Sequence, residues 1–297
     1  MEYDYQVSNQ VTLEWVLKNM PKFLFPDLAK KKDRIQKKMI GVVATHERTP
    51  VGLLLATDDN SGKNFRIHSF LVHPKFRNKG IGSAILDHLE QYLFKIRGEN
   101  VDLYYRQHWP FTPYLKKILE RQGWDIPRQD LIIVKGDAIN VNKLFMHKQI
   151  QLPESYSFTP FLEISKEDQA YILGRKKREN WYLDYLDPFV QPETICAPAS
   201  LALRKDGHII GWVISHLIAP HLNEFTALFI DQQHRPYKQA HILMREAITR
   251  QQQAGIRQFL ITSKVDNQVM SRFLMRHADE TEVFITQSFY TKKSLIE

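Results

Sequence analysis

Apolar positions along the first half of the chain switch between helical spacing and the unbroken runs that are typical of buried strands. Residues 11–20, for example, place Leu13, Val16, Leu17 and Met20 on one side of a helix. The same patterns predict, in chain order, strands at 39–45 and 51–57 joined as a hairpin, a strand at 65–72, a helix from Gly80 to Arg97, a strand at 101–106, a helix at 112–122 and a strand at 131–134. Strands and helices that alternate in this way predict a layered α/β (α+β) domain.

The second half repeats this order after a segment of weak periodicity. That segment, residues 136–160, contains Pro153 and Pro160 and predicts a linker. We therefore predict domains over 1–140 and 161–297, joined by a linker over 141–160. The elements expected in the second domain are helical residues 166–186, strands at 200–204, 209–218 and 225–230, a helix at 238–253, a strand at 257–262, a helix at 267–277 and a strand at 282–290.

The two halves also align residue by residue, which predicts an internal duplication. A shift of 158 positions carries Arg77 onto Arg235, just after an apolar strand in each half. The same shift pairs Phe70, Leu71 and Val72 with Leu228, Phe229 and Ile230, Gly82 with Ala240, and Ile85 and Leu86 with Leu243 and Met244, while Gly52 meets Gly211 at a shift of 159. The shared arginine at the junction of strand and helix favours duplication over a chance match of apolar strands.

The segment with the clearest chemistry is RNKGIG, residues 77–82, between a predicted strand and a predicted helix. The first turn of a helix offers unpaired backbone N–H groups and the positive end of the helix dipole. Gly80 and Gly82 leave those groups accessible, and Arg77 and Lys79 add positive charge. This combination predicts a site for a diphosphate. The segment matches neither the P-loop pattern GxxxxGK[ST] nor the dinucleotide pattern GxGxxG.

The segment resembles the signature (Q/R)xxGx(G/A) of the GCN5-related N-acetyltransferase (GNAT) superfamily, with Arg77, Gly80 and Gly82 at the fixed positions. The likeness is strongest over residues 39–124 and extends over the whole chain as a tandem duplication. It implies two tandem GNAT-like domains, each a mixed, mostly antiparallel central sheet flanked by helices. It also implies an enzyme that transfers an acetyl (acyl) group from acetyl-CoA directly to an amine acceptor within a ternary complex.

The resemblance further implies how the cosubstrate is held. Backbone amides of the signature would bind the pyrophosphate of acetyl-CoA, and the preceding strand would pair with the pantetheine arm. The residues expected to bind the cosubstrate are Leu71, Val72, Arg77, Asn78, Lys79, Gly80, Ile81, Gly82 and Ser83. No metal is expected, because the histidines lack zinc-type spacing and the sequence has no HExxH.

The attacking amine must lose a proton, which requires a general base with a pKa near neutrality. His68 is the candidate, since it lies on the strand that leads into the signature. Its segment HSFLVHPKFR is similar to the arylalkylamine acetyltransferases, in which a histidine at this strand position serves as the base. A histidine that only packs or faces solvent is the alternative.

The general acid is harder to assign. The family often places a tyrosine just before a Gly-aromatic pair, but here Leu119 occupies that position before Gly123 and Trp124. Tyr114 is the weak candidate for the acid, and Tyr104 and Tyr105 are further possibilities. Each of these tyrosines also fits a packing role, and water can protonate the thiolate instead.

The second copy departs from the signature. Its segment RPYKQA, residues 235–240, has Lys238 where the first glycine belongs, and Pro236 removes one backbone N–H group. Leu274 again stands at the tyrosine position. We therefore expect a degenerate second domain that packs against the first or shapes the substrate cleft.

The net charge of +8 favours polyanionic partners, which include nucleic acid, anionic membranes and phosphate-rich cofactors. Basic residues cluster between Lys30 and Lys38, a run that also fits a solvated helix face. The sequence has no RNP-type aromatic pattern and no zinc-finger spacing, which disfavours nucleic acid. A small-molecule or peptide amine is the expected acceptor, and the sequence carries no signal for an oligomeric state.

The only cysteine, Cys196, excludes an internal disulfide, fits a reducing compartment and is expected to be a small core residue. The N-terminus is polar, and no apolar run approaches the roughly 20 residues that span a bilayer. We therefore expect a cytoplasmic protein that does not associate with membranes.

The sequence is compatible with three classes of function. An N-acyltransferase is favoured. A non-catalytic acyl-CoA-binding regulatory or scaffold protein is the alternative, because the tyrosine is missing. A nucleic-acid or ribosome-associated binder rests on the basic run alone.

Overall fold

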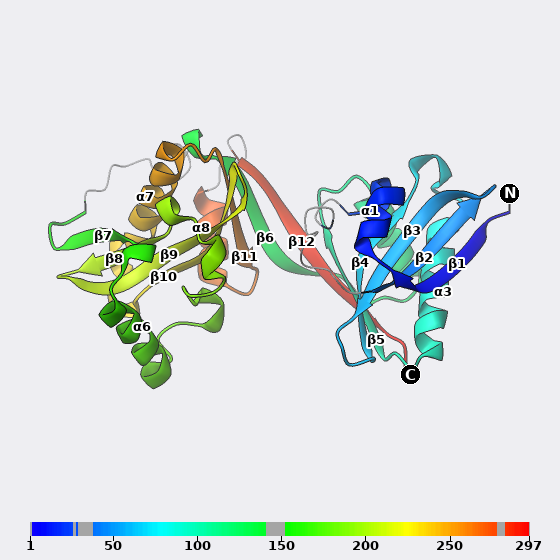
Figure 1. The fold of residues 1–297 in the computed structure, drawn as a ribbon, viewed down its shortest axis with the longest axis horizontal. Helices are drawn as coiled ribbons and strands as arrows, with labels where there is room; N and C mark the ends of the chain where they lie inside the picture. Colours follow the sequence, from blue (N-terminus) through cyan, green and yellow to red (C-terminus); the bar gives the residue numbers. More distant parts are fainter. Residues whose placement is uncertain (1, 26–27, 29–37, 141–151, 278–282, 297) are drawn as a thin grey trace. The chain divides into compact units, whose positions relative to one another are not determined.

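The computed structural model describes residues 2–25, 28, 38–140, 152–277 and 283–296 (Figure 1). It divides into two compact units, of which the first contains residues 1–130 and 287–297 and the second contains residues 131–286. In each unit helices pack against a twisted sheet (Figure 1). The expected fold class, two tandem layered domains with mostly antiparallel sheets, is confirmed.

The sheet of the first unit has the strand order β1-β2-β3-β4-β5-β12. Neighbouring strands are antiparallel except β4 and β5, which are parallel. The strands are β1 (Asp4–Val11), β2 (Met39–His46), β3 (Thr49–Asp58), β4 (Asn64–Val72), β5 (Asn100–Arg106) and β12 (Val283–Ser294), and the helices are α1 (Leu13–Asn19), α3 (Ile81–Lys95), α4 (Thr112–Arg121) and the short 3₁₀ turns η1 (Pro21–Phe23) and η3 (Pro74–Phe76).

The second unit has the strand order β6-β11-β10-β9-β8-β7, with β10 and β11 parallel and the other pairs antiparallel. Its strands are β6 (Arg128–Asp137), β7 (Tyr156–Pro160), β8 (Leu201–Lys205), β9 (His208–Ala219), β10 (Leu222–Ile230) and β11 (Gln258–Lys264). Its helices are α6 (Lys166–Glu179), α7 (Gln239–Gln253), α8 (Gln268–His277) and the 3₁₀ turns η4 (Ala138–Asn140), η5 (Phe161–Glu163), η6 (Asp184–Leu186), η7 (Pro192–Thr194), η8 (Ala197–Ala199) and η9 (Gln232–Tyr237).

The second unit buries both faces of its sheet, because successive side chains of a strand point to opposite sides. On β8, Leu201 and Leu203 pack into the core that contains α7, and Ala202 between them packs into the core around Trp212. Cys196 lies in the first of these cores and is 4% exposed, so its expected role as a small core residue is confirmed.

The parallel strands part at the same place in both units. Pairing of β4 with β5 runs from Asn64↔Asn100 to Ile67↔Leu103, yet β4 continues to Val72. Pairing of β10 with β11 runs from Leu222↔Gln258 to Phe225↔Ile261, which is the same register 158 residues later. The duplication read from the sequence is therefore present in the backbone, and each unit opens a gap beside the second half of its central strand.

The C-terminal strand β12 completes the first unit. Residues Ser288–Ser294 pair with β5, Phe289 stacks on Tyr105 at 5.5 Å between ring centres, and Lys293 forms an ion pair with Glu90. The predicted second domain extends to residue 297, whereas residues 287–297 group with the first unit and residues 131–140 with the second.

Most elements have the type expected from the sequence, but three differences are clear. Strand β1 was not among the expected elements. Residues 156–160 of the predicted linker form β7 and pair with β8, so the linker prediction is wrong there, and residues 141–151 lie outside the described residues. The helix expected over 166–186 ends at Glu179, because Asn180 adopts a left-handed conformation (φ 47°) that cannot continue a helix.

The role of β12 predicts that Phe289→Ala destabilises the first unit by about 2 kcal/mol, since it removes a ring packed on Tyr105 and beneath Lys116. Amide hydrogen exchange of Asn100–Arg106 should accelerate accordingly. The control is Phe284→Ala on the same strand, where the side chain is 47% exposed. Equal effects of the two variants on β5 would contradict this role.

Candidate active site

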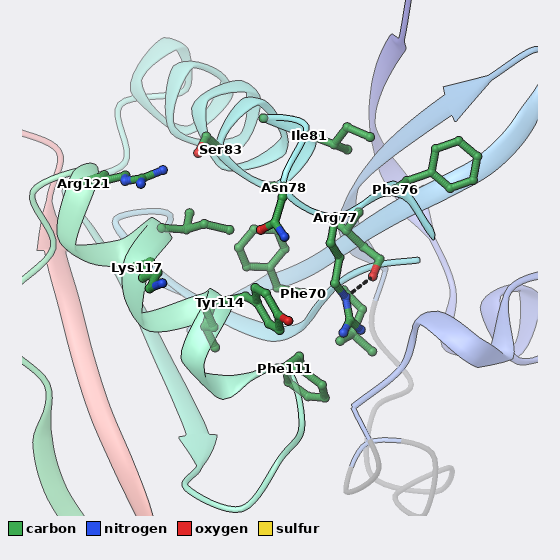
Figure 2. A pocket seen from close by; sticks show the side chains of 16 residues that line it. Phe70, Phe76, Arg77, Asn78, Ile81, Ser83, Phe111, Tyr114, Lys117 and Arg121 are labelled. Carbon is green, nitrogen blue, oxygen red and sulfur yellow. Dashed lines mark hydrogen bonds between the residues drawn. The ribbon is translucent and has the colours of Figure 1, made fainter. Parts of the chain in front are cut away.

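A cleft of about 340 Å³ opens in the first unit beside the end of β4 (Figure 2). The end of β4, the loop after it and the first turn of α3 form one wall, and α4 forms the other. The lining residues are Phe70, Leu71, Val72, Phe76, Arg77, Asn78, Gly80, Ile81, Gly82, Ser83, Phe111, Tyr114, Leu115, Lys117, Ile118 and Arg121. The cleft thus brings together the residues expected to bind a cosubstrate, except Lys79, whose ammonium lies 5.3 Å from the centre of the Phe76 ring.

The first turn of α3 presents uncapped backbone donors to this cleft. Gly80 precedes the helix in a left-handed conformation (φ 78°), which glycine adopts without strain. It has no side chain to accept a hydrogen bond, whereas Thr12 and Ser165 cap α1 and α6. The first helical bond runs from the Ala84 N–H to the Gly80 oxygen, so the N–H groups of Ile81–Ser83 precede it.

The second glycine of the signature allows α4 to approach α3. A Cβ atom added at Gly82 would lie 2.6 Å from Cδ1 of Ile118, closer than real carbon atoms come. Gln122, just after α4, donates from Nε2 to the Ser83 oxygen at 2.9 Å and to Asp87 Oδ1 at 2.6 Å. These contacts fix the width of the cleft at the start of α3.

Arg77 spans the mouth of the cleft. Its Nε donates to the Val72 oxygen at 3.1 Å, and its guanidinium carbon lies 5.5 Å from the centre of the Tyr114 ring (Figure 2). The His73 N–H donates to the Val51 oxygen on β3, so strand alternation directs the backbone groups of Val72 to the opposite edge, away from β3. Arg77 therefore occupies the strand edge that the parting of β4 from β5 exposes.

The cleft is positively charged. Arg77, Lys117 and Arg121 line it, and no aspartate or glutamate is among its lining residues. Lys117 and Arg121 come from α4 and were not among the residues expected from the sequence. The helical spacing of the two residues placed them on one face, but which face of α4 meets the cleft is set by packing rather than by local sequence.

Comparison with known proteins agrees with this geometry. Residues 10–107 match the model of the Acetyltransferase (GNAT) family.

The chain carries a GNAT-family domain.

Solved structures extend the likeness to the whole fold. A tandem GNAT protein from the clavulanic acid biosynthesis pathway superposes with a TM-score of 0.63 at 12% identity, over 100% of this chain and 99% of that one. A GCN5-related N-acetyltransferase from Sphaerobacter thermophilus gives 0.60 at 14% identity, over 91% and 85%. A glucosamine N-acetyltransferase region of a fungal multi-domain β-N-acetylglucosaminidase gives 0.61 at 13% identity, over 99% of this chain and 38% of that one. No curated protein sequence matches the chain.

The candidate base of the GNAT domain lies next to the cleft rather than in its lining. His68 follows Ile67, the last residue of β4 that pairs with β5, and is half-buried. Its Nε2 lies 2.7 Å from Oγ1 of Thr57 on β3. The histidine thus stands at the apex of the gap between β4 and β5, where the two strands begin to part.

The tyrosines occupy different environments. Tyr114 lines the cleft and is 42% exposed, whereas Leu119 at the family's tyrosine position is 1% exposed. Tyr105 is buried in the core, and burial raises its pKa to about 12. Tyr104 packs against Tyr290 on β12. Of the three, the structure places only Tyr114 in the cleft lining.

The second GNAT-like unit keeps the backbone conformation of the loop but has a lysine in place of the first glycine. Lys238 stands at the position of Gly80 and takes the same left-handed conformation (φ 60°) before α7. A non-glycine residue pays about 1 kcal/mol or more for this conformation. Lys238 thus carries a side chain where Gly80 has none, and Pro236 lacks a backbone N–H group.

The loop of the second unit is also tied to α6. Asp231 Oδ2 accepts from Arg175 at 2.8 Å and from Trp181 Nε1 at 3.0 Å, and its other oxygen accepts from the Gln233 N–H. Burial alone would raise the pKa of the Asp231 carboxyl, but these hydrogen bonds together outweigh it, and the pKa lies below its usual value. His73, at the matching position of the first unit, accepts only a long contact of 3.4 Å from the Lys75 N–H at its Nδ1.

A smaller hollow of about 170 Å³ remains where β10 and β11 part. None of the loop residues 231–239 is among those that line it. Thr226, the counterpart of His68, lines this hollow and contacts His216 Nδ1 at 3.0 Å through its Oγ1, and His216 Nε2 contacts the Val190 oxygen at 3.0 Å. The first unit thus has the threonine on β3 and the histidine on β4, whereas the second has the histidine on β9 and the threonine on β10. Both ring nitrogens of His216 have a hydrogen-bond partner.

In the part of the chain that the structure describes, no group of three or more His, Cys, Asp or Glu side chains comes together as metal ligands. No helix within the described ranges is both long and apolar enough to cross a bilayer. Of the basic run 30–38, only Lys38 lies within the described residues. The cytoplasmic location expected from the sequence stays a prediction.

The Asp231 network predicts that Asp231→Asn destabilises the second unit by about 3 kcal/mol at pH 7, because it leaves Arg175 without its buried partner. Asp184→Asn is the control, since the Asp184 side chain is 95% exposed in its ion pair with Lys176. Urea unfolding followed by Trp181 and Trp212 fluorescence measures both variants.

The same network sets a pH dependence. A carboxyl whose pKa is depressed by folding stabilises the protein above its unfolded value of 3.8, and this stabilisation is lost as the pH falls through the folded value. The difference between wild type and Asp231→Asn should therefore shrink below about pH 4. If Asp231→Asn lowers the free energy of unfolding at pH 7 no more than Asp184→Asn does, the Asp231 network does not hold the loop.

Proposed function

We propose that this protein is an N-acyltransferase that moves an acetyl group from acetyl-CoA to an amine acceptor, with its cosubstrate site in the first unit. One observation carries the proposal. An uncapped helix start with a left-handed glycine, Gly80, opens into a cleft lined by three cations and no carboxylate, beside the free edge of a strand. This arrangement suits an extended ligand with a diphosphate at one end.

The N–H groups of Ile81–Ser83 are suited to bind the diphosphate, because they lie at the positive end of the α3 dipole. The Val72 backbone is suited to pair with the amides of the pantetheine arm, as the GNAT resemblance implies. An arriving pantetheine N–H would replace Arg77 Nε at the Val72 oxygen. Arg77 would then be released toward the anionic end of the ligand.

The reaction requires few protein groups. The amine nitrogen attacks the thioester carbonyl, a C–N bond forms, the C–S bond breaks, and the amine proton must pass to a base. His68 is our candidate for the base, since it stands at the apex of the gap where the thioester and the amine would meet. Tyr114 is the cleft-lining hydroxyl that can protonate the departing thiolate, and water is the alternative.

We expect the acceptor to be a small-molecule or peptide amine, in keeping with the acyl-transfer chemistry of the family. We propose that the second unit does not bind CoA, because Lys238 has a side chain where Gly80 leaves open space and Pro236 has no backbone N–H to donate. A non-catalytic acyl-CoA-binding protein would share the cleft but release no thiol on addition of an acceptor.

Binding is tested by titration with CoA or acetyl-CoA. At about 100 times its dissociation constant the ligand should stabilise the protein by about 2.7 kcal/mol, with one site per chain. Gly80→Arg should abolish the shift by filling the loop, whereas Arg235→Ala at the matching position should leave it intact. Two sites per chain, or loss of binding through Arg235→Ala alone, would contradict the assignment of a single CoA site to the first unit.

Catalysis is tested by His68→Ala, which should lower kcat by about 10²–10⁴-fold and leave CoA binding nearly unchanged. The acidic limb of the pH–rate profile, where protonation of the base lowers the rate, should be lost along with it. His88→Ala on α3, whose ring nitrogen contacts the Ala84 oxygen and which does not line the cleft, is the control. A pH–rate profile that is the same in wild type and His68→Ala would remove His68 from the mechanism.

A further inference from the structure

Two basic side chains on α4 line the cleft opposite the signature loop. Lys117 and Arg121 are four residues apart, so they lie one above the other on the same face of the helix. Figure 2 shows Arg121 and Lys117 on the α4 side, with Ser83 at the start of α3 across from them. They extend the positive lining of the cleft away from Arg77 and the strand edge.

Nothing in the described part of the chain neutralises this pair. Neither residue forms an ion pair with a described carboxylate, and the cleft lining contains no acidic residue. The nearby carboxylate of Asp87 accepts from Gln122 instead. Uncompensated like charges one helical turn apart repel each other, and they recover this cost when an anion binds between them.

The packing of α4 holds the pair in place. Gln122 anchors the end of the helix to Ser83 and Asp87, and Ile118, between the two cations, contacts the helix at Gly82. Lys117 and Arg121 are both exposed. Their position is thus set by α4, while the flexible side chains can reach a ligand that lies in the cleft mouth.

We propose that Lys117 and Arg121 bind the 3′-phosphate of coenzyme A and make the site selective for CoA over dephospho-CoA. The inference rests on the proposed function. CoA carries a diphosphate and a separate ribose 3′-phosphate. The amides at the start of α3 suit the diphosphate, and a second anion on the α4 wall requires donors of its own, for which a lysine and an arginine at helical spacing are suited.

The test measures dissociation constants of CoA and dephospho-CoA, which differ only in the 3′-phosphate, for wild type, Lys117→Gln/Arg121→Gln and the control Lys116→Gln. Lys116 is on the same helix but stacks over the Phe289 ring outside the cleft. Wild type should prefer CoA by about tenfold at low salt. The double variant should lose that preference through weaker CoA binding, with dephospho-CoA affinity nearly unchanged, and Lys116→Gln should keep it.

Three outcomes would overturn the inference. Wild type that binds CoA and dephospho-CoA equally has no 3′-phosphate site. If the double variant loses affinity for CoA and dephospho-CoA alike, Lys117 and Arg121 bind the diphosphate or act only through the overall charge of the cleft. Loss of preference in Lys116→Gln would show that general charge, not this pair, is responsible. Failure of wild type to bind either ligand would instead contradict the proposed function itself.

Discussion

The parting of two parallel strands is the constraint on which the rest of the structure depends. While β4 and β5 are paired, as far as Ile67 and Leu103, their backbone groups satisfy each other. Beyond that point β4 continues to Val72 still paired with β3 on one side, and its other edge is unpaired by any strand in the described residues. An unpaired edge requires another hydrogen-bonding partner, and Arg77 supplies one to the Val72 oxygen. The cleft, its loop and its charges are all arranged around this free edge.

Comparison of the two units distinguishes features that the fold requires from features that the site requires. Both units part their strands in the same register, and both place a left-handed residue just before the following helix. Only the first unit has glycine at that residue. In the second unit Asp231 joins the loop to Arg175 and Trp181, so side chains of the unit itself hold the start of the loop. The left-handed conformation is therefore common to both units, whereas the residue that adopts it differs between them.

Much of the site could be predicted from the sequence because its determinants are local. Gly80 and Gly82 lie within one turn of a helix start, and their spacing between a predicted strand and a predicted helix indicates accessible amides. Lys117 and Arg121 could not be found in this way, since the face of α4 that meets the cleft depends on the contact of Ile118 with the helix at Gly82. The position of His68 on its strand was predictable, but the register shift opposite it on β3, between Leu55 and Ala56, was not, because it depends on how the two strands pair.

The same distinction applies to the fold. Hairpins and amphipathic helices follow from short-range periodicity, so their types could be predicted. The pairing of β12 with β5 joins Ser288 to Arg106, and no local pattern encodes a contact over such a separation. Strand β1 shows a partial alternation, with Tyr5 and Val7 packed on the core, but its many polar residues mask the period of two. Asn180 ends α6 through its own backbone conformation, which helical periodicity does not report.

The central claim is that acyl-CoA binds where β4 parts from β5 and not at the matching place in the second unit. Hydrogen exchange with and without acetyl-CoA tests it most directly, because amides that bind a diphosphate exchange slowly. We expect acetyl-CoA to slow exchange over residues 78–84 and to leave exchange over residues 232–242 unchanged. Protection of 232–242 with none at 78–84 would contradict it.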